Sequence, residues 1–203
     1  LLASAKHPGI FCGWGAVDAT TELKAIAEAL GAPVATTLQG LSSFPATHPL
    51  HAGFALGPAA VPASENAFRD CDCLLAVGTR FAEIPTGSYG YEPPANLIHV
   101  DINPRVFNAN YPAAVTLQGD ARAVLSALAA ALGPAPAGPA RAARVALQIA
   151  TDKADYRKQW LAHDSKGRVN PQRFFDALRD RLPDDGIVIA DDGNTSVSLP
   201  EIP

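Results

Sequence analysis

Cysteine, net charge and long apolar runs are all scarce in this chain of 203 residues, and each scarcity excludes a class of protein. Three cysteines, an odd number, do not form a disulfide framework, which favours a reducing cytoplasm as the location. A formal net charge of −4 argues against broad binding to nucleic acids or anionic membranes. No apolar run approaches the roughly 20 residues that a transmembrane helix requires.

The patterns of common catalytic and metal sites are also missing. There is no GxSxG, P-loop or HExxH pattern, and no nucleophile is paired with a base. Cys71 and Cys73 form the only close pair of thiols, so buried strand residues are a better interpretation than a zinc site. His48 and His51 are better interpreted as hydrogen-bonding loop residues than as metal ligands. The residues alone therefore favour binding of a nucleotide or cofactor over catalysis.

Short apolar runs alternate with amphipathic segments along the first two thirds of the chain. This alternation predicts right-handed βαβ crossovers and a Rossmann-like parallel sheet with helices on both faces. The predicted strands are 8–12, 33–37, 74–77, 97–100 and 114–117. The predicted helices begin at Thr20 or Thr21, at a Ser64 cap, and after Gly119-Asp120. Residues 38–62 are predicted to be a long irregular loop, a feature that is often functional.

The last third of the chain has a different organisation. A Pro- and Gly-rich linker at 133–140 precedes a helix predicted over 141–161. A second helix over 172–182, capped by Asn170, leads to a predicted strand at 187–190. We therefore expect a nucleotide-binding-like domain at 1–134, a linker and connecting helix at 135–165, and an incomplete second α/β unit at 166–203. Both ends look like cuts from a longer protein.

Charged side chains follow two neighbouring predicted strands, at the edge where open α/β sheets bind ligands. Arg80 could hold a phosphate in a bidentate fork, and Asp101 could accept hydrogen bonds from ribose hydroxyls. Their structural alternatives are a surface salt bridge and a turn or helix cap. Asp120 could also be an ordinary cap.

A glycine pair follows the first strand. Gly13 and Gly15 would let the backbone approach a pyrophosphate, but Asp18 stands where the third glycine of GxGxxG belongs. A tight strand-to-helix turn remains an equal alternative. Asp191-Asp192 could hold Mg²⁺, although no second set of ligands follows.

Several segments together resemble the central domain of thiamine-diphosphate-dependent enzymes of the acetolactate synthase type. That group includes pyruvate oxidase, oxalyl-CoA decarboxylase, glyoxylate carboligase and benzaldehyde lyase. The matching segments are 8–16 (PGIFCGWGA), 33–40 (PVATTLQG), 47–53 (THPLHAG), 72–81 (DCLLAVGTRF), 97–104 (LIHVDINP) and Gly119-Asp120. Residues 187–194 (IVIADDGN) resemble the first strand of the family's C-terminal domain.

The resemblance implies a parent protein with three α/β domains that uses thiamine diphosphate and Mg²⁺. The N-terminal domain of the family supplies an activating glutamate, and the C-terminal domain binds the diphosphate. The middle domain is a six-stranded parallel sheet that holds FAD or ADP in several members. Beside the glycine pair Gly13 and Gly15, the resemblance implies nucleotide contacts from Thr37, Leu38, His51, Gly53, Arg80, Asp101, Asn103, Gly119 and Asp120, with Gly193 and Asn194 approaching thiamine diphosphate.

One departure affects the choice of nucleotide. Flavin-binding members carry a second glycine-rich turn of the GMHG kind, where this chain has residues 54–58 (FALGP). ADP, a CoA-type nucleotide or no ligand therefore remain open beside FAD.

The resemblance predicts a carboligase or decarboxylase, a transferase or lyase acting on 2-oxo acids, whose parent is a homodimer or homotetramer. We expect the chain alone to be inactive. The alternatives are a stand-alone NAD-type module and a structural domain without a ligand. A deacylase-like module would usually need four zinc cysteines, and the chain has three.

Overall fold

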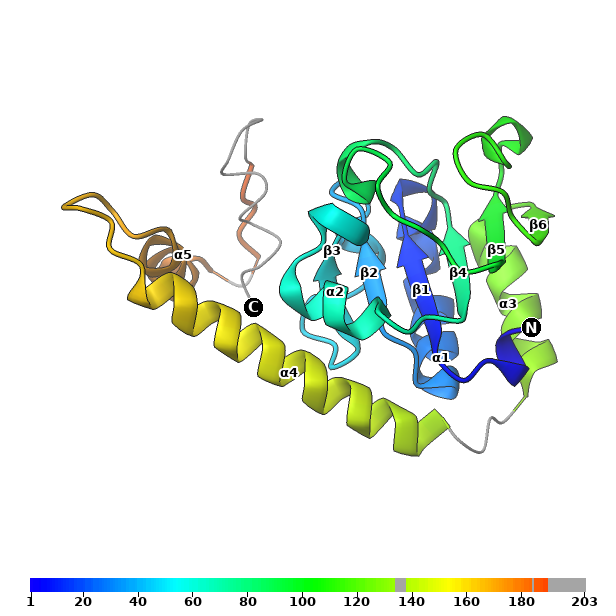
Figure 1. Ribbon diagram of the computed structural model, residues 1–203, viewed down its shortest axis with the longest axis horizontal. Coiled ribbons are helices and arrows are strands. Elements are labelled where there is room, and N and C mark those ends of the chain that lie inside the picture. Colours follow the sequence, from blue (N-terminus) through cyan, green and yellow to red (C-terminus); the bar gives the residue numbers. More distant parts are fainter. Residues whose placement is uncertain (134–137, 184, 190–203) are drawn as a thin grey trace.

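The fold is a six-stranded parallel sheet in the order β3-β2-β1-β4-β5-β6, extended by two further helices (Figure 1). The computed structural model describes residues 1–133, 138–183 and 185–189. The strands are β1 Pro8–Cys12, β2 Val34–Thr36, β3 His51–Phe54, β4 Cys73–Val77, β5 Asn96–Asp101 and β6 Val115–Gln118. The α-helices are α1 Thr20–Leu30, α2 Pro62–Phe68, α3 Ala121–Leu132, α4 Gly138–Ala162 and α5 Pro171–Arg181. The predicted Rossmann-like sheet is thus confirmed.

Both faces of the sheet are buried, as expected for parallel strands covered by crossover helices. Alternate residues of β4 enter different cores: Leu75 and Val77 pack with α1 and α3, while Leu74 and Ala76 pack with α2 and with Phe81 from the following loop. The central strands β1 and β4 are completely buried. This rigid centre fixes the positions of the loops at its carboxyl end.

Helix α1 begins without the predicted threonine cap. The short 3₁₀-helix η2 (Trp14–Ala19) runs directly into α1, so Thr20 lies inside the helical segment and the N-cap is Ala19. The Thr20 hydroxyl instead contacts the carbonyl oxygen of Ser43 at 3.0 Å. The predicted stop is confirmed, because Gly31 ends α1 in the left-handed region at φ 61°.

Helix α2 begins two residues before the predicted Ser64 cap. Pro62 occupies the first helical turn, where its missing N–H costs no hydrogen bond. The buried Ser64 hydroxyl donates to the carbonyl of Ala55 at 2.7 Å, tying α2 to the end of β3. Serine therefore joins two elements here instead of starting one.

The expectation of a continuous irregular loop over 38–62 is wrong, because this stretch contains β3 and two 3₁₀-helices. These are η3 (Leu41–Ser43) and η4 (Gly57–Ala59). Strand β3 is a short edge strand that contains Gly53 at φ 117°, and its register with β2 shifts between Val34 and Ala35. Glycine and a bulge obscure the alternation that normally marks a strand.

Helix α4 runs along the edge of the sheet that lies opposite the carboxyl ends of the strands (Figure 1). It begins at Gly138, three residues before its predicted start, and contacts both α1 and α2. Arg141 donates to the carbonyl of Leu30 at 2.7 Å. None of the described helices is long and apolar enough to cross a membrane.

The C-terminal helix α5 is held on α4 by the bidentate pair of Arg157 and Asp176. Its predicted cap is confirmed: the Asn170 side chain accepts from the Arg173 amide at 3.2 Å. Residues 187–189 form no strand, and Ile187 and Ile189 are about nine-tenths exposed. A strand needs a pairing partner, and the described residues supply none for this segment. Ala190 and the predicted Asp191-Asp192 site lie outside the described residues.

Candidate functional site

The strand order places a crevice between the carboxyl ends of β1 and β4. From β1 the chain crosses to β2 on one side, and from β4 it crosses to β5 on the other. Ligands of open α/β sheets bind at this reversal of direction. A cavity of about 510 Å³ occupies the crevice. Its lining residues are Gly13, Trp14, Gly15, Thr37, Gln39, Gly78, Thr79, Arg80, Ala82, Pro85, Asp101, Asn103 and Val106.

Six of the predicted site residues converge on this cavity: Gly13, Gly15, Thr37, Arg80, Asp101 and Asn103. Five others stay outside its lining: Leu38, His51, Gly53, Gly119 and Asp120. Gly193 and Asn194 lie outside the described residues. Seven further residues line the cavity without having been assigned to it: Trp14, Gln39, Gly78, Thr79, Ala82, Pro85 and Val106. All but Pro85 lie within three residues of an assigned position, and this proximity could have indicated them.

The glycine pair after β1 serves contact between two loops. The Gly13 amide donates to the carbonyl of Val77 at 2.9 Å, and the Gly15 amide donates to the carbonyl of Gly78 at 3.0 Å. A Cβ atom on Gly15 would lie 2.8 Å from the Gly78 Cα, and one on Gly13 would collide with the Gly78 carbonyl. Both amides are therefore occupied, and close backbone packing explains both glycines.

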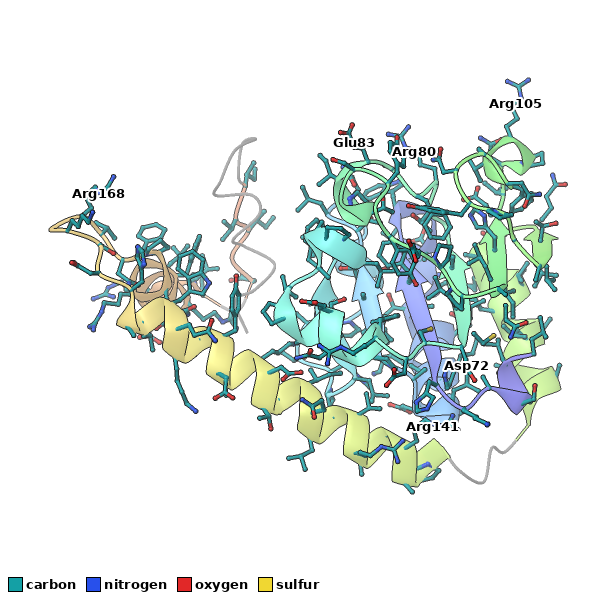
Figure 2. The ribbon with its side chains drawn as sticks, in the orientation of Figure 1. Asp72, Arg80, Glu83, Arg105, Arg141 and Arg168 are labelled. Atoms are coloured by element: carbon teal, nitrogen blue, oxygen red, sulfur yellow. The ribbon has the colours of Figure 1, made fainter. Side chains whose placement is uncertain are left out.

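The loop after β4 is bonded differently. Gly78 and Phe81 have φ values of 60° and 53°, and the Phe81 amide donates to the Thr79 hydroxyl at 3.2 Å. Within the described residues, the amides of Thr79 and Arg80 donate no hydrogen bond. The exposed Arg80 side chain makes no hydrogen bond or ion pair there either, and it projects from the carboxyl edge (Figure 2). A positive side chain beside unoccupied amides is suited to an anion.

The polar end of β5 forms the opposite wall. One carboxylate oxygen of Asp101 accepts from the Asn103 amide at 2.8 Å, and the Asn103 side chain accepts from Arg105 at 3.1 Å. The second oxygen of Asp101 has no partner among the described residues, so it can accept from a hydroxyl ligand. Asp101 is thus both a turn residue and an available acceptor.

Gly119 and Asp120 support this wall from outside. The Gly119 amide donates to the Asp101 carbonyl at 3.1 Å, which fixes the last residue of β5. Asp120 caps α3 by accepting from the Ala123 amide at 3.0 Å. The capping alternative considered for Asp120 is therefore present in the structure.

His51 and Gly53 are buried in β3, away from the cavity lining. The His51 ring stacks on Phe44 with centroids 6.2 Å apart. Burial, aided by the charge of Lys153, lowers the pKa of His51 to about 3, so its ring is neutral at physiological pH. Neither ring nitrogen has a hydrogen-bond partner among the described residues.

A second cavity of about 580 Å³ adjoins the first. The two share Gln39, Arg80, Ala82, Pro85 and Val106 as lining residues. The second is completed by Glu83, Ile84, Tyr89, Arg105, Ala109 and Asn110. Arg80 therefore stands at the junction of two cavities along the carboxyl edge.

The described residues gather no group of three or more His, Cys, Asp or Glu side chains that could hold a metal. Burial raises the pKa of Cys71 to about 12, so this residue is a thiol at neutral pH. The arrangement at the carboxyl edge is equipped to bind a polar, negatively charged ligand.

Comparisons with known proteins identify the family. The family model described as "Thiamine pyrophosphate enzyme, central domain" matches residues 1–128. The chain is 40% identical over 135 residues to a probable acetolactate synthase large subunit of Methanocaldococcus jannaschii, covering 65% of this chain and 23% of that protein. It is 35% identical over 190 residues to a probable 2-ketoarginine decarboxylase of Pseudomonas aeruginosa, covering 94% and 32%.

A third relative extends this range of activities. The chain is 33% identical over 217 residues to a sulfoacetaldehyde acetyltransferase of Rhodobacter capsulatus, covering 96% of this chain and 36% of that protein. The chain thus spans about a quarter to a third of the length of these relatives. It belongs to the thiamine pyrophosphate enzyme family and contains that family's central domain.

Proposed function

We propose that this chain is part of a thiamine-diphosphate-dependent carboligase or decarboxylase that acts on 2-oxo acids, and that its central domain binds an adenine nucleotide. In this proposal residues 1–134 are the nucleotide-binding domain, 135–165 a linker with its connecting helix, and 166–203 the start of the diphosphate-binding domain. The names of the acetolactate synthase and the 2-ketoarginine decarboxylase support this reaction class, and the name of the sulfoacetaldehyde acetyltransferase supports a transferase. Thiamine diphosphate and Mg²⁺ would be bound largely by parts of the parent beyond this chain.

The observation that carries the nucleotide proposal is the cavity between β1 and β4. Its volume of about 510 Å³ lies within the range of small-molecule sites. The Arg80 guanidinium and the free amides of Thr79 and Arg80 would bind the phosphates. The unbonded oxygen of Asp101 would accept from a ribose hydroxyl, as acidic residues after strands do in related folds.

The ring system of the nucleotide would lie against Trp14. This side chain lines the cavity and is 66% exposed, so its ring is accessible to a ligand there. A planar base or flavin would cover it by stacking. ADP and FAD both carry the adenosine diphosphate group that these contacts would recognise, so both are candidate ligands.

The remaining parts of the proposal concern the parent protein. Three free cysteines agree with a reducing cytoplasm as its location. A homodimer or homotetramer would place its active sites between subunits. The purified full-length parent should convert a 2-oxo acid only when thiamine diphosphate and Mg²⁺ are supplied, and turnover without thiamine diphosphate would overturn the proposed reaction class.

The nucleotide proposal is tested by calorimetric titration of the chain with ADP and with FAD. Replacing Arg80 with Ala should lower affinity about 10- to 100-fold, because charge-assisted hydrogen bonds to phosphate would be lost. Arg69→Ala is the matched control: Arg69 is exposed and is bonded to Asn66. Equal affinities in the two variants would remove Arg80 from the site. Absence of binding to either ligand would leave the scaffold alternative.

A further inference from the structure

The loop that carries Arg80 is held from behind by two side chains. Nδ2 of Asn110 donates to the carbonyl oxygens of Arg80 and Phe81, both at 3.0 Å. Nε2 of His99 donates to the carbonyl oxygen of Thr79 at 2.8 Å. A carbonyl only accepts hydrogen bonds, so Nε2 carries the proton in this tautomer. Three consecutive carbonyl groups are therefore fixed.

This loop needs such restraint because its conformation is unfavourable. Phe81 has a φ of 53°, in the left-handed region that residues with a Cβ atom rarely adopt. Its ring is buried, with centroid distances of 5.2 Å to both His99 and Tyr111. Backbone strain of this kind persists only where surrounding contacts determine the conformation. The ring anchors Phe81, and the bonds from Asn110 fix the adjoining peptide groups.

The restraint also determines what the loop presents to the cavity. With the carbonyls of residues 79–81 occupied, the amides of Thr79 and Arg80 remain without partners among the described residues. The Arg80 side chain is likewise unbonded in that part of the chain. Asn110 contributes no charge and lines only the second cavity, so its link to the first cavity runs through the backbone of residues 80 and 81.

We propose that Asn110 is a positioning residue for the nucleotide site. It fixes the backbone of the Arg80 loop so that the guanidinium and the free amides face the phosphates. This role rests on the proposed nucleotide binding. Replacing Asn110 would cost its two hydrogen bonds but would leave no buried cavity, because the residue is exposed, so the chain should stay folded.

The first test is a double-mutant cycle with ADP, measured by calorimetry. Asn110→Ala should lower affinity about three- to tenfold, the effect expected from losing hydrogen bonds of ordinary strength. Because Asn110 acts through the Arg80 loop, the same substitution should cause a smaller loss in an Arg80→Ala background, where only the backbone amides of the loop remain to be positioned. Losses that simply multiply in the double variant would overturn the proposal.

Asn96→Ala is the matched control for this cycle. Asn96 is also exposed, and its side chain also donates to a backbone carbonyl, that of Asp72 at 3.1 Å, but it lies at the opposite edge of the sheet. This variant should bind ADP as the unmodified chain does. A loss of affinity equal to that of Asn110→Ala would indicate a general structural effect and overturn the proposal.

The second test needs no ligand. Amide hydrogen exchange, followed by NMR, reports on the bond from the Phe81 amide to the Thr79 hydroxyl. Asn110→Ala should speed exchange at Phe81, and Asn96→Ala should not. Unchanged exchange would overturn the positioning role. Faster exchange in a chain that binds neither ADP nor FAD would support the loop restraint while contradicting nucleotide binding.

Discussion

The edge of the sheet at the amino ends of its strands and the edge at their carboxyl ends use similar residues in different ways. One aspartate at each edge shows the contrast best. Asp72, at the amino end of β4, accepts from the amides of Lys6 and His7 at 2.8 and 2.9 Å, so both of its oxygens are occupied. Asp101, at the carboxyl end of β5, has one occupied oxygen and lines a cavity. Figure 2 shows Asp72 and Arg80 at opposite edges.

A second contrast lies within the carboxyl edge itself. The glycine turn after β1 uses the amides of Gly13 and Gly15 to bind the β4 loop, while that loop leaves the amides of Thr79 and Arg80 without partners in the described structure. Satisfied polar groups stabilise the fold, and unsatisfied groups around a cavity are available to a ligand. A glycine pattern alone does not distinguish these two uses.

The largest effect should come from replacing Gly78, where the loop after β4 packs against the glycine turn after β1. Gly78→Ala would bring a Cβ into the backbone of Gly15, including its Cα at 2.5 Å, in addition to the strain of a φ of 60°. We expect a loss of about 2–4 kcal/mol in the free energy of unfolding, combining overpacking with left-handed strain. Urea denaturation followed by circular dichroism measures this.

Gly167→Ala separates the two contributions in that loss. Gly167 also has a positive φ, 76°, but a Cβ there would meet nothing within 4 Å. It should cost only about 1–2 kcal/mol, from backbone strain. Equal losses of stability in the two variants would contradict close packing between the turn after β1 and the loop after β4.

The two aspartates should respond differently to replacement: Asp101 should mainly affect ligand affinity and Asp72 should affect stability, both by intermediate amounts. Asp101→Ala should lower ADP affinity about tenfold, since it removes an acceptor facing the ligand, and should cost less than about 1 kcal/mol of stability, since only its bond to the Asn103 amide is lost. Asp72→Ala should cost about 1–2 kcal/mol of stability and leave affinity unchanged, since it removes two bonds to backbone amides. Calorimetry and urea denaturation of both variants check the pattern. A loss of ADP affinity in Asp72→Ala would contradict the proposed difference between the two aspartates.

The smallest effect concerns pH. Burial of Asp72 opposes its charged form, but the amides of Lys6 and His7 outweigh burial and hold the pKa of its carboxyl below the usual value. The charged form is therefore favoured by folding. Its contribution is present above the unfolded-state pKa of about 3.9 and is lost as pH falls through the folded-state pKa.

The pH effect is measured as the stability difference between the unmodified chain and Asp72→Asn. We expect a difference below about 1 kcal/mol at pH 7 that shrinks under pH 4, because solvent screens this partly exposed group. A difference that grows on acidification would have the wrong sign for a depressed pKa.

Periodicity and turn chemistry predicted most of the sheet and its helices, because their signals are local. Gly31, Asn170 and Asp120 act as the predicted helix stop and caps. Strand β3 was not predicted, because its four residues are extended through pairing with β2 and not through local preference. The helix caps predicted at Thr20 and Ser64 were wrong, because the hydroxyls of these residues bond to distant backbone carbonyls. Local sequence does not reveal such bonds.

The site was predictable where residues directly follow central strands. Arg80 and Asp101 reach the cavity because β4 and β5 are parallel neighbours that end at the same edge. His51 did not, because β3 lies at the far end of the sheet and the ring is buried. The occupation of the Gly13 and Gly15 amides depends on how two loops meet, so only the three-dimensional structure reveals it.

The most direct test of nucleotide binding at the carboxyl edge is an NMR titration of the ¹⁵N-labelled chain with ADP. We predict that the amide signals of Thr79, Arg80 and Asn103 shift saturably, while those of Asp72 and Asn96 at the opposite edge stay in place. Shifts confined to the Asp72 edge, or no saturable shifts, would contradict the account.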